Sequence, residues 1–532
     1  MKARLLKNFR RPLQDIILAV EAVFDRAFGP KWNPLRQLGS LAFFAYWLVA
    51  GTGLYLFVVF DTSVSEAYSS VEYLTNEQWY LGGIARSFHR YGSDAMVLLA
   101  VLHMVREFTF DRYRDVRWYT WFLGVPILWL LLFSGISGYW LVWDELAQYI
   151  AVASMEWLDW LGIFGQRIAS NFLTRGSLGD RFFTLLIFMH IFAPLMLLFI
   201  MWFHVIRVSR PKINPPRGLG VGLVLMLLAL SLAKPAISHG PADLGVSPTV
   251  LNMDWFYMMF YPMFDEYGPG ALWGMALALT ALTAAMPWLP PMRQPRSAVV
   301  DLEKCNGCTR CYEDCPFNAV TMMPRSDGRP FREEAVVDGD LCTACGICVG
   351  ACPISTPFRS SDELSTGIDL PDLSLTKLRA LTDKAMDKLK GEPADGEPKV
   401  LVFGCDHGAE TRLIEQPGVS GFSMPCIAML PPSFIDYALS GKGVDGVLLA
   451  GCRQCDCYSR LGDHWMRARI DGSRDPSLRK RVPRERFHTA WAARTDRTAL
   501  EGELNGFRAS LKALAPASLA PASLAPASGG DG

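Results

Sequence analysis

The first 300 residues of this 532-residue chain contain no cysteine. All 13 cysteines follow that point, so the N-terminal half offers no thiol for a disulfide or a metal site. The chain also lacks net charge, because 52 Lys and Arg balance 52 Asp and Glu, which gives no general attraction to nucleic acid. Long apolar runs nearly all lie before Pro295, and charged residues crowd the part after it. The composition therefore indicates a membrane half followed by a soluble half.

Six apolar runs in the first half each have about the twenty residues that a helix needs to cross a bilayer. They lie near residues 38–60, 80–105, 118–143, 182–206, 218–237 and 269–289. Residues 1–31 are basic and then amphipathic, without a continuous apolar core or a small-residue cleavage site. We therefore expect a surface helix there and not a signal peptide, and a six-helix membrane domain over residues 32–295.

Lysine and arginine are missing from two loops between these runs, residues 61–79 and 238–269. They are concentrated in two other loops: Arg106, Arg112, Arg114 and Arg117 follow the second run, and Arg207, Arg210, Lys212 and Arg217 follow the fourth. Positively charged loops stay in the cytoplasm, so we expect a bacterial inner (cytoplasmic) membrane protein with both termini and the soluble half cytoplasmic. Cysteines on that reducing side are expected to bind metal and not to form disulfides.

Two of the apolar runs carry a histidine at each end, with the same spacing in both. "HRYGSDAMVLLAVLH" runs from His89 to His103, and "HIFAPLMLLFIMWFH" runs from His190 to His204. Fourteen residues along a helix rise about 21 Å and return to nearly the same face. If the two helices face each other, His89 meets His190 and His103 meets His204, and each pair would hold a haem iron from both sides. Interhelical hydrogen bonding is the alternative role for such histidines.

Glycines with the same spacing lie on neighbouring runs, namely Gly39 and Gly53 on the first and Gly124 and Gly138 on the third. A missing Cβ lets a flat macrocycle approach the backbone, although glycine is common in membrane helices for other reasons. Arg86 lies one turn before His89. We expect it either to hold a haem propionate or to anchor its helix at the membrane interface.

Residues 32–290 resemble cytochrome b of the quinol-oxidising bc complexes. The similarity rests on "WNPLRQLGSL", "RSFHRYG" and "SGYWLVWDE" in the first three helices. It implies a helical bundle with two b haems, the outer one held by His89 and His190 and the inner one by His103 and His204. Family members are dimers, so a homodimer is expected by analogy. Nothing in the chain resembles a Rieske centre or a cytochrome c attachment motif.

"SPTVLNMDWFYMMFYPM" resembles the Pro-Glu-Trp-Tyr segment at the outer quinol site of that family. The four positions read Met253, Asp254, Trp255 and Phe256 here, and Val142 stands where the family usually has proline. Asp254 thus keeps the carboxylate in shortened form. The resemblance implies that Asp254 delivers protons to a quinone at the edge of the outer haem. Capping of a helix is the alternative role for this aspartate.

The soluble half contains two copies of the motif C-x2-C-x2-C-x3-C-P, "CNGCTRCYEDCP" and "CTACGICVGACP". In this motif three close thiolates hold one cubane, and the fourth reaches the other cubane. We therefore expect two [4Fe-4S] clusters, one on Cys305, Cys308, Cys311 and Cys352, and one on Cys342, Cys345, Cys348 and Cys315. A zinc site would have looser four-ligand spacing. Residues 296–359 match the α+β fold of two-cluster bacterial ferredoxins.

The rest of the chain alternates strands and helices. Residues 360–398 are expected to be a polar linker with one packing helix, whose apolar stripe is Leu375, Leu378, Leu381 and Leu389. In residues 399–500, "KVLVFGC" and "VDGVLLAGC" indicate buried strands of a small α/β domain with a parallel sheet. Cysteines at strand ends lie where such sheets place their sites. Residues 501–532 are expected to finish a helix and then form a disordered tail, since "LAPAS" repeats three times from Leu514 to Ser528.

Five cysteines lie in this last region: Cys405, Cys426, Cys452, Cys455 and Cys457. "MPCIAMLPPSFIDYAL" and "GVLLAGCRQCDCY" resemble the iron-sulfur delta subunit of methyl-viologen-reducing hydrogenases, over about residues 399–492. The resemblance implies a [2Fe-2S] cluster on Cys405, Cys426, Cys452 and Cys457. Cys455 would be an extra thiol that could exchange into the ligand set. The resemblance also implies docking to a heterodisulfide-reductase-like flavoprotein.

Together these parts predict a multidomain, membrane-bound electron-transfer protein, a quinone-reactive oxidoreductase subunit of a respiratory chain. Electrons would pass from a cytoplasmic heterodisulfide-reductase-like flavoprotein, or another iron-sulfur protein, through the clusters and two b haems to the quinone pool. Two alternatives stay open: the reverse flow, from quinol to a cytoplasmic acceptor, and a redox-passive membrane anchor for a soluble enzyme. Membrane lipid is the other expected partner, and no nucleic acid is expected.

Overall fold

The computed structural model describes residues 2–174, 177–207, 210–247, 250–289, 295–359, 364–391, 396–409, 411, 416–441 and 443–514. The predicted disordered tail with its LAPAS repeats lies outside these residues, apart from Leu514. The chain divides into two compact units. The N-terminal unit comprises residues 1–207 and 211–292, and the C-terminal unit comprises residues 208–210 and 293–532.

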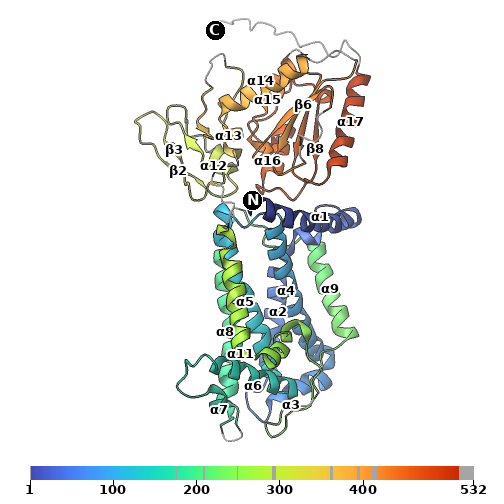
Figure 1. Cartoon of the computed structure of the whole chain (residues 1–532), viewed down its shortest axis with the longest axis vertical. Helices are drawn as coiled ribbons and strands as arrows, with labels where there is room; N and C mark the ends of the chain where they lie inside the picture. The colour runs from blue at the N-terminus through green and yellow to red at the C-terminus, as the bar shows by residue number, and fades with distance from the viewer. Residues whose placement is uncertain are drawn as a thin grey trace. The chain divides into compact units, whose positions relative to one another are not determined.

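The N-terminal unit is helical throughout its described elements. Its α-helices are α1 (Lys2–Phe28), α2 (Leu38–Val59), α3 (Ala67–Glu72), α4 (Ile84–Thr109), α5 (Trp118–Val142), α6 (Glu145–Asp159), α7 (Ile168–Phe172), α8 (Asp180–Ile206), α9 (Arg217–Ala233), α10 (Trp255–Met258) and α11 (Tyr261–Ala285). Figure 1 shows the long helices of this unit side by side, with α3, α6 and α7 together at one end and α1 across the other. Helix α11 is kinked at Gly268, where φ is +77° just before Pro269.

All six predicted spans are helices, but the six-span count is not confirmed. Four segments of the described chain are long and apolar enough to cross a membrane: Leu38–Val59, Asp115–Val142, Asp180–Ile206 and Phe256–Trp288. Helix α9 has only 17 residues. Helix α4 is long, but Arg90 and Asp94 interrupt its apolar sequence. Charged residues inside a membrane bundle are costly unless they face partners in its interior, which directs attention to α4.

Buried ion pairs hold the amphipathic helix α1 against the end of α4. Glu21 is fully buried and accepts a hydrogen bond of 2.8 Å from Arg106 Nε. Arg36 Nε lies 3.7 Å from the same carboxylate and also pairs with Asp25. Removing one partner of a buried pair typically costs about 3–5 kcal/mol, so these contacts fix α1 to the loop-rich end of the bundle.

The C-terminal unit contains strands and shorter helices. They are β1 (Val299–Val300), α12 (Arg310–Asp314), β2 (Val320–Pro324), β3 (Glu333–Val337), α13 (Ile347–Ala351), β4 (Ile368–Asp369), α14 (Leu375–Gly391), β5 (Val400–Cys405), β6 (Val419–Met424), η7 (Ile427–Met429), α15 (Ser433–Ser440), β7 (Gly446–Gly451), α16 (Gly462–Asp471), β8 (Phe487–Trp491) and α17 (Arg497–Ala513). β1 pairs with β4 and β2 with β3, both antiparallel. The last four strands form the predicted parallel sheet, in the order β6-β5-β7-β8.

Helices cover both faces of the parallel sheet, because its central strands have buried side chains on both faces. Val400 and Val402 of β5 pack with the buried residues of α17, whereas Leu401 and Phe403 belong to the core on the other face. Helix α17 buries Leu500, Leu504, Phe507 and Leu511, which recur at three- and four-residue steps. It therefore packs with the sheet although residue 500 was the predicted domain boundary. Helix α14 packs by Leu375, Leu378 and Leu389, but Leu381 of the predicted stripe is 37% exposed.

Candidate functional site

Two long helices bring the four predicted histidines together in pairs. Helix α4 carries His89 and His103, and helix α8 carries His190 and His204. The imidazole rings of His89 and His190 have centroids 6.3 Å apart and an interplanar angle of 59°. A metal ion bound by both rings through bonds of about 2 Å would place the centroids about 6 Å apart. The spacing of this pair therefore fits a single iron between the rings.

The outer ring nitrogens of this pair are engaged by neighbouring helices. His89 Nδ1 lies 3.0 Å from the Val49 carbonyl oxygen and 3.3 Å from Thr52 Oγ1. His190 Nδ1 lies 3.1 Å from Ser137 Oγ. A metal-bound histidine usually donates its second N–H to such a group, which orients the ring and leaves Nε2 for the metal. Both rings thus have the arrangement that a bis-histidine site needs.

Three of the four predicted glycines lie directly against these imidazoles. A Cβ added to Gly53 would lie 2.8 Å from His89 Cε1, and one added to Gly138 would lie 3.1 Å from His190 Cε1. A Cβ on Gly39 would lie 3.4 Å from His103 Cε1. Gly124 differs, because its nearest neighbour would be Met104 Cε at 3.9 Å. Glycine therefore keeps the space beside three of the histidine rings open.

The second predicted pair is held less fully than the first. His204 Nδ1 is buried, and among the described residues no hydrogen bond orients it as Ser137 orients His190 Nδ1. The Nε2 atom, which would bind the metal, is therefore less firmly directed in this ring. His103 and His204 fit the residue types of a second haem site, although the structure orients them less completely than His89 and His190.

Asp254 lies in a network that the sequence did not reveal. It begins α10, where Oδ1 accepts a hydrogen bond of 2.8 Å from Phe256 N. Its Oδ2 is contacted by Arg90 Nη2 and accepts a hydrogen bond from Tyr139 Oη. Arg90 Nη1 also reaches Asp94 Oδ1 at 2.6 Å. The cap role is therefore present, and the same carboxylate is also tied to a guanidinium and a phenol inside the bundle.

Arg86 is engaged in other contacts. Its guanidinium lies 3.6 Å from Glu72 Oε1, donates to Ser238 Oγ at 2.8 Å and also contacts Thr75 Oγ1. These contacts link α4 to the segments before it and after α9. Binding of a propionate by Arg86 would have to compete with them.

The eight cysteines of the two ferredoxin motifs separate into the two predicted sets. Cys305, Cys308, Cys311 and Cys352 line one pocket. In the other set, burial raises the pKa of both Cys345 and Cys348, and the neighbouring thiols of Cys315 and Cys342 raise it further. Backbone amides point at this second set, since Ala319 N donates to Cys315 Sγ at 3.3 Å and Ala298 N to Cys342 Sγ at 3.4 Å.

The thiols of both sets are chemically suited to iron. Burial raises the pKa of Cys311 and of Cys345 to about 12, and neighbouring thiols act in the same direction. Such thiols ionise only next to positive charge, and a coordinated metal supplies that charge and removes the proton outright. The donor sets therefore fit the two iron-sulfur clusters that the motifs predict.

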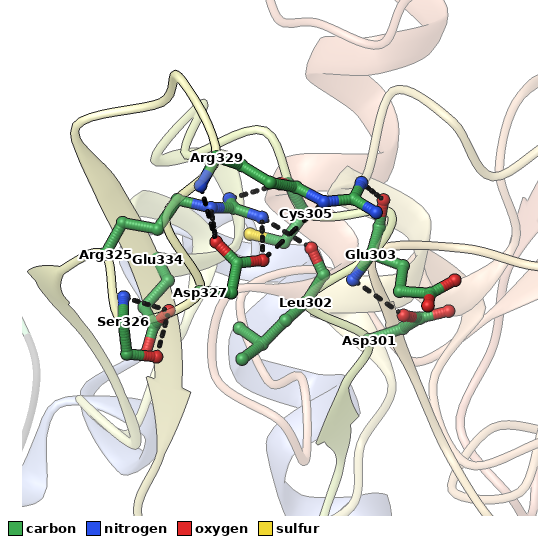
Figure 2. A network of polar contacts seen from close by, with 9 residues as sticks. All are labelled: Asp301, Leu302, Glu303, Cys305, Arg325, Ser326, Asp327, Arg329 and Glu334. Atoms are coloured by element: carbon green, nitrogen blue, oxygen red, sulfur yellow. Dashed lines mark hydrogen bonds and ion pairs between the residues drawn. The ribbon is translucent and has the colours of Figure 1, made fainter.

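A partly buried arginine braces the loop that carries Cys305 (Figure 2). Arg325 lies just after β2 and donates to the Cys305 carbonyl and to the Leu302 carbonyl, both at 2.6 Å. Asp327 accepts from Arg325 Nε at 2.6 Å, and this hydrogen bond holds the pKa of Asp327 below its usual value. The hairpin of β2 and β3 thus fixes the position of the first cysteine motif.

Four of the remaining cysteines meet at the carboxyl edge of the parallel sheet. Cys405 ends β5 and Cys452 follows β7, and their Sγ atoms are 3.3 Å apart. Hydrogen bonds from Cys426 and Cys452 hold the pKa of Cys457 well below its usual value. In the described residues no three ligand-type side chains surround a single-ion position. The sulfurs instead pack on one another, and Cys455 stands apart, exposed and with φ of +61°.

Three family models match successive segments of the chain. "Cytochrome b/b6/petB" matches residues 24–211, "4Fe-4S dicluster domain" matches residues 304–356, and "Methyl-viologen-reducing hydrogenase, delta subunit" matches residues 396–515. The order is the one that the sequence resemblances predict. The last match extends past residue 500 and includes α17, in agreement with its packing on the sheet.

Individual relatives cover the membrane part. Cytochrome b of Rhodospirillum rubrum is 24% identical over 291 residues, which are 48% of this chain and 69% of that protein. Cytochrome b6 of Porphyra purpurea is 28% identical over 206 residues, 37% of this chain and 94% of that protein. A chain of a hyperthermophilic respiratory complex III aligns with 19% identity and a TM-score of 0.38, over 48% of this chain and 75% of that chain. A score this low carries no argument about the fold.

Proposed function

Since a cytochrome b/b6 domain, a dicluster domain and a delta-subunit domain follow one another in this multi-pass membrane protein, we propose that it couples a soluble redox enzyme to the quinone pool. Electrons enter from a cytoplasmic heterodisulfide-reductase-like flavoprotein or another iron-sulfur protein. They pass through a [2Fe-2S] and two [4Fe-4S] clusters and then two b haems to quinone. The bound groups carry the single electrons, and the protein supplies ligands, spacing and the control of protons.

The observation that carries this proposal is the His89–His190 pair. Ring centroids 6.3 Å apart, with Nδ1 of each ring held by a neighbouring helix, leave both Nε2 atoms for one iron. In the proposal these histidines hold the outer haem, and His103 and His204 hold the inner one. Glycines at positions 39, 53 and 138 leave room beside the rings. A redox-passive anchor would have no use for this arrangement.

Asp254 is the group that we assign to proton transfer. A quinone that accepts two electrons also takes up two protons, and a carboxylate within hydrogen-bond reach delivers them. Tyr139 donates to Asp254 Oδ2, and Arg90 holds the same oxygen while binding Asp94. Arg90 and Tyr139 orient the carboxylate, and release of either contact would free Oδ2 for a substrate. The structure thus adds Arg90, Asp94 and Tyr139 to the single residue that the sequence indicated.

The direction of electron flow follows from the side on which the proton donor lies. Arg106 and the following arginines belong to the α1 end of the bundle, whereas Asp254 contacts Arg90, near the other end of α4. With positive loops inside, Asp254 faces the outer side of a bacterial inner membrane. Electrons that move outward from cytoplasmic clusters go down the membrane potential, worth about 2.3 kcal/mol per charge per 100 mV, which favours quinone reduction.

The test is to reduce the full-length membrane protein with dithionite, remove the excess, add quinone and follow haem reoxidation by absorbance. Rapid reoxidation supports the proposal, and an absent haem spectrum or no reaction with quinone supports the anchor. Incubating the oxidised protein with quinol is the companion experiment. Cluster reduction by quinol that is faster than haem reoxidation by quinone would reverse the proposed direction.

A further inference from the structure

The ferredoxin-type region and the α/β region of the C-terminal unit share one hydrophobic core. A single cluster of buried side chains contains Ile347 and Cys348 of the first region together with Phe403, Cys426 and Cys457 of the second. The iron-sulfur sets of both regions are therefore held in one compact body, and their order within it can be derived.

The thiol set of the α/β region lies next to one particular ferredoxin set. A Cβ on Gly462 would lie 2.3 Å from Cys426 Sγ, 3.3 Å from Cys457 Sγ and 3.7 Å from Ile347 Cδ1. Only the space of a glycine thus separates these thiols from α13, whose residue Ile347 precedes Cys348. Cys345 lies two residues before Ile347, at the start of the same segment. Both Cys345 and Cys348 belong to the set that includes Cys315 and Cys342.

Two more glycines make this close approach possible. A Cβ on Gly350 would lie 2.1 Å from the Ala428 carbonyl oxygen, which is on η7 just after Cys426. A Cβ on Gly346 would lie 2.6 Å from Met429 Sδ. The motif "CGICVG" therefore presses its backbone against η7. A larger residue at Gly350 would collide with backbone and push η7 away, whereas at Gly346 the Met429 side chain could move aside.

The other ferredoxin set is lined by different parts of the fold. The pocket of Cys305, Cys308, Cys311 and Cys352 includes Met322 of β2, Ala335 of β3 and Ile368 of β4, and no residue after 368. This set is thus surrounded by the two small antiparallel sheets. Of the two ferredoxin sets, it is therefore the set of Cys315, Cys342, Cys345 and Cys348 whose segment adjoins the thiols of the α/β region.

A group of charged side chains stabilises this contact. Arg469 of α16 is fully buried and donates through Nη2 to Asp314 Oδ2 at 2.5 Å and through Nη1 to the Ala428 carbonyl at 2.7 Å. Asp314 directly precedes Cys315. Arg474 Nε donates to Asp314 Oδ1 at 2.6 Å, and Trp465 Nε1 donates to the Asp314 carbonyl at 3.2 Å. Arg469 thereby ties the residue before Cys315 to the segment after Cys426.

We propose that Arg469 is a positioning residue that fixes the order of electron transfer, with the cluster on Cys315, Cys342, Cys345 and Cys348 as the sole direct partner of the cluster on Cys405, Cys426, Cys452 and Cys457. This proposal rests on the proposed electron-transfer function and specifies its internal route. One electron leaves the C-terminal cluster, which is oxidised, and reduces the neighbouring cubane. No bond forms or breaks, and no proton moves in this step.

The order is tested by removing one cubane at a time from the full-length protein. The variant Cys342→Ala/Cys345→Ala removes two ligands of the neighbouring set, and Cys305→Ala/Cys308→Ala removes the matching two of the other set. In the fully reduced state we expect fast spin relaxation of the C-terminal cluster signal in electron paramagnetic resonance. The first variant should slow that relaxation, and the second should leave it unchanged. The opposite pattern, or no change in either variant, overturns the order.

The role of Arg469 is tested with a charge-neutral pair, because a single deletion would leave Asp314 poorly paired and could prevent folding. Arg469→Met/Asp314→Asn removes both charges and keeps side-chain volume. We expect unchanged iron content and a nearly unchanged midpoint potential of the neighbouring cubane, because the two lost charges offset each other, but electron exchange slower by about tenfold or more. Arg469→Lys should also keep the potential but not the full rate, because lysine lacks the fork that binds both partners.

Arg310→Ala is the matched control, since Arg310 pairs with Asp475 across the same contact at 3.0 Å but is partly exposed. It should leave the rate of exchange between the C-terminal cluster and the neighbouring cubane unchanged. If the neutral pair behaves like Arg310→Ala, Arg469 has no positioning role. These measurements concern exchange between clusters, whereas the proposed function is tested by haem reoxidation with quinone, so either can fail without the other.

Discussion

The two units of this protein hold their candidate ligands by different means. In the N-terminal unit, each imidazole of the His89–His190 pair is steadied by neutral groups of an adjacent helix, the Val49 carbonyl and the Ser137 hydroxyl. In the C-terminal unit, the loops that carry thiols are braced by the partly buried Arg325, by the fully buried Arg469 and by backbone amides. The first unit thus uses shape and neutral hydrogen bonds, and the second uses positive charge.

The difference follows from the charge of the ligands. A histidine binds metal as a neutral ring, so a carbonyl or hydroxyl on its second nitrogen is sufficient and adds no charge to a membrane interior. A cysteine binds metal as a thiolate, whose negative charge is stabilised by N–H dipoles and cations. Arg90 is the exception in the membrane unit, and it lies beside the two carboxylates that we assign to proton transfer or its support.

The largest effect should come from the histidines. His89→Ala or His190→Ala should remove the outer haem and keep the inner one, because each ring supplies one axial ligand of the same iron. His103→Ala or His204→Ala should remove only the inner haem. Pyridine haemochrome quantitation with redox spectra checks this. Loss of the same haem in all four variants would disprove the pairing.

Single cysteine substitutions should likewise distinguish a predicted cluster ligand of the last domain from the extra thiol of Cys455. Cys457→Ser should abolish the [2Fe-2S] signal in electron paramagnetic resonance and spare both cubanes, because Cys457 is hydrogen-bonded to both Cys426 and Cys452 within the set. Cys455 is exposed, so Cys455→Ser should leave the signal nearly intact. A reversed result would place Cys455 in the ligand set.

A smaller effect is expected at the proton-transfer network. Asp254→Asn should slow quinone-driven haem reoxidation by about tenfold or more without a change in haem content, since an amide cannot shuttle the proton. Asp265→Asn is the control, because Asp265 also accepts from a tyrosine, Tyr149, at 2.6 Å but is exposed and has no arginine bound to it in the described residues. Equal rates in both variants would place the quinone site elsewhere.

The smallest effect concerns the glycines. Gly53→Ala should shift the spectrum and midpoint potential of the outer haem, because the new Cβ would lie 2.8 Å from His89 Cε1 and would turn the ring. Gly124→Ala should be silent, since its Cβ would meet only Met104 Cε at 3.9 Å. Redox titration of both variants against the wild type distinguishes them. A shift in the Gly124 variant alone would contradict the geometry.

The sequence predicted the long helices and the parallel sheet because both are periodic in hydrophobic residues. It also indicated the ligand types, since histidine spacing and cysteine motifs are local patterns. It did not identify Arg90 and Tyr139 as partners of Asp254, or Asp94 as a second partner of Arg90. Asp254 begins α10, whereas the other three lie on α4 and α5, more than a hundred positions earlier in the chain. The only local hint was a charged residue directly after His89 in an apolar helix.

Domain boundaries were also harder to place than motifs. The predicted linker contains α14, and Leu375, Leu378 and Leu389 of that helix join the core that both iron-sulfur regions share. Leu381 has the right residue type for that core but points to solvent, since four leucines at steps of three and eight do not all fit one helix face. Composition alone marked this segment as polar and did not show what it packs against.

The sequence by itself determined which groups this protein can hold: two histidine pairs at one helical spacing, two ferredoxin motifs and a third set of cysteines at strand ends. These follow from covalent order, because ligands of one motif are close along the chain. Only the tertiary structure decided which sets are neighbours, with Gly462, Gly350 and Arg469 bringing Cys426 beside α13. Such contacts join residues far apart in sequence, and they form only when two faces become complementary in shape and their buried charges are paired.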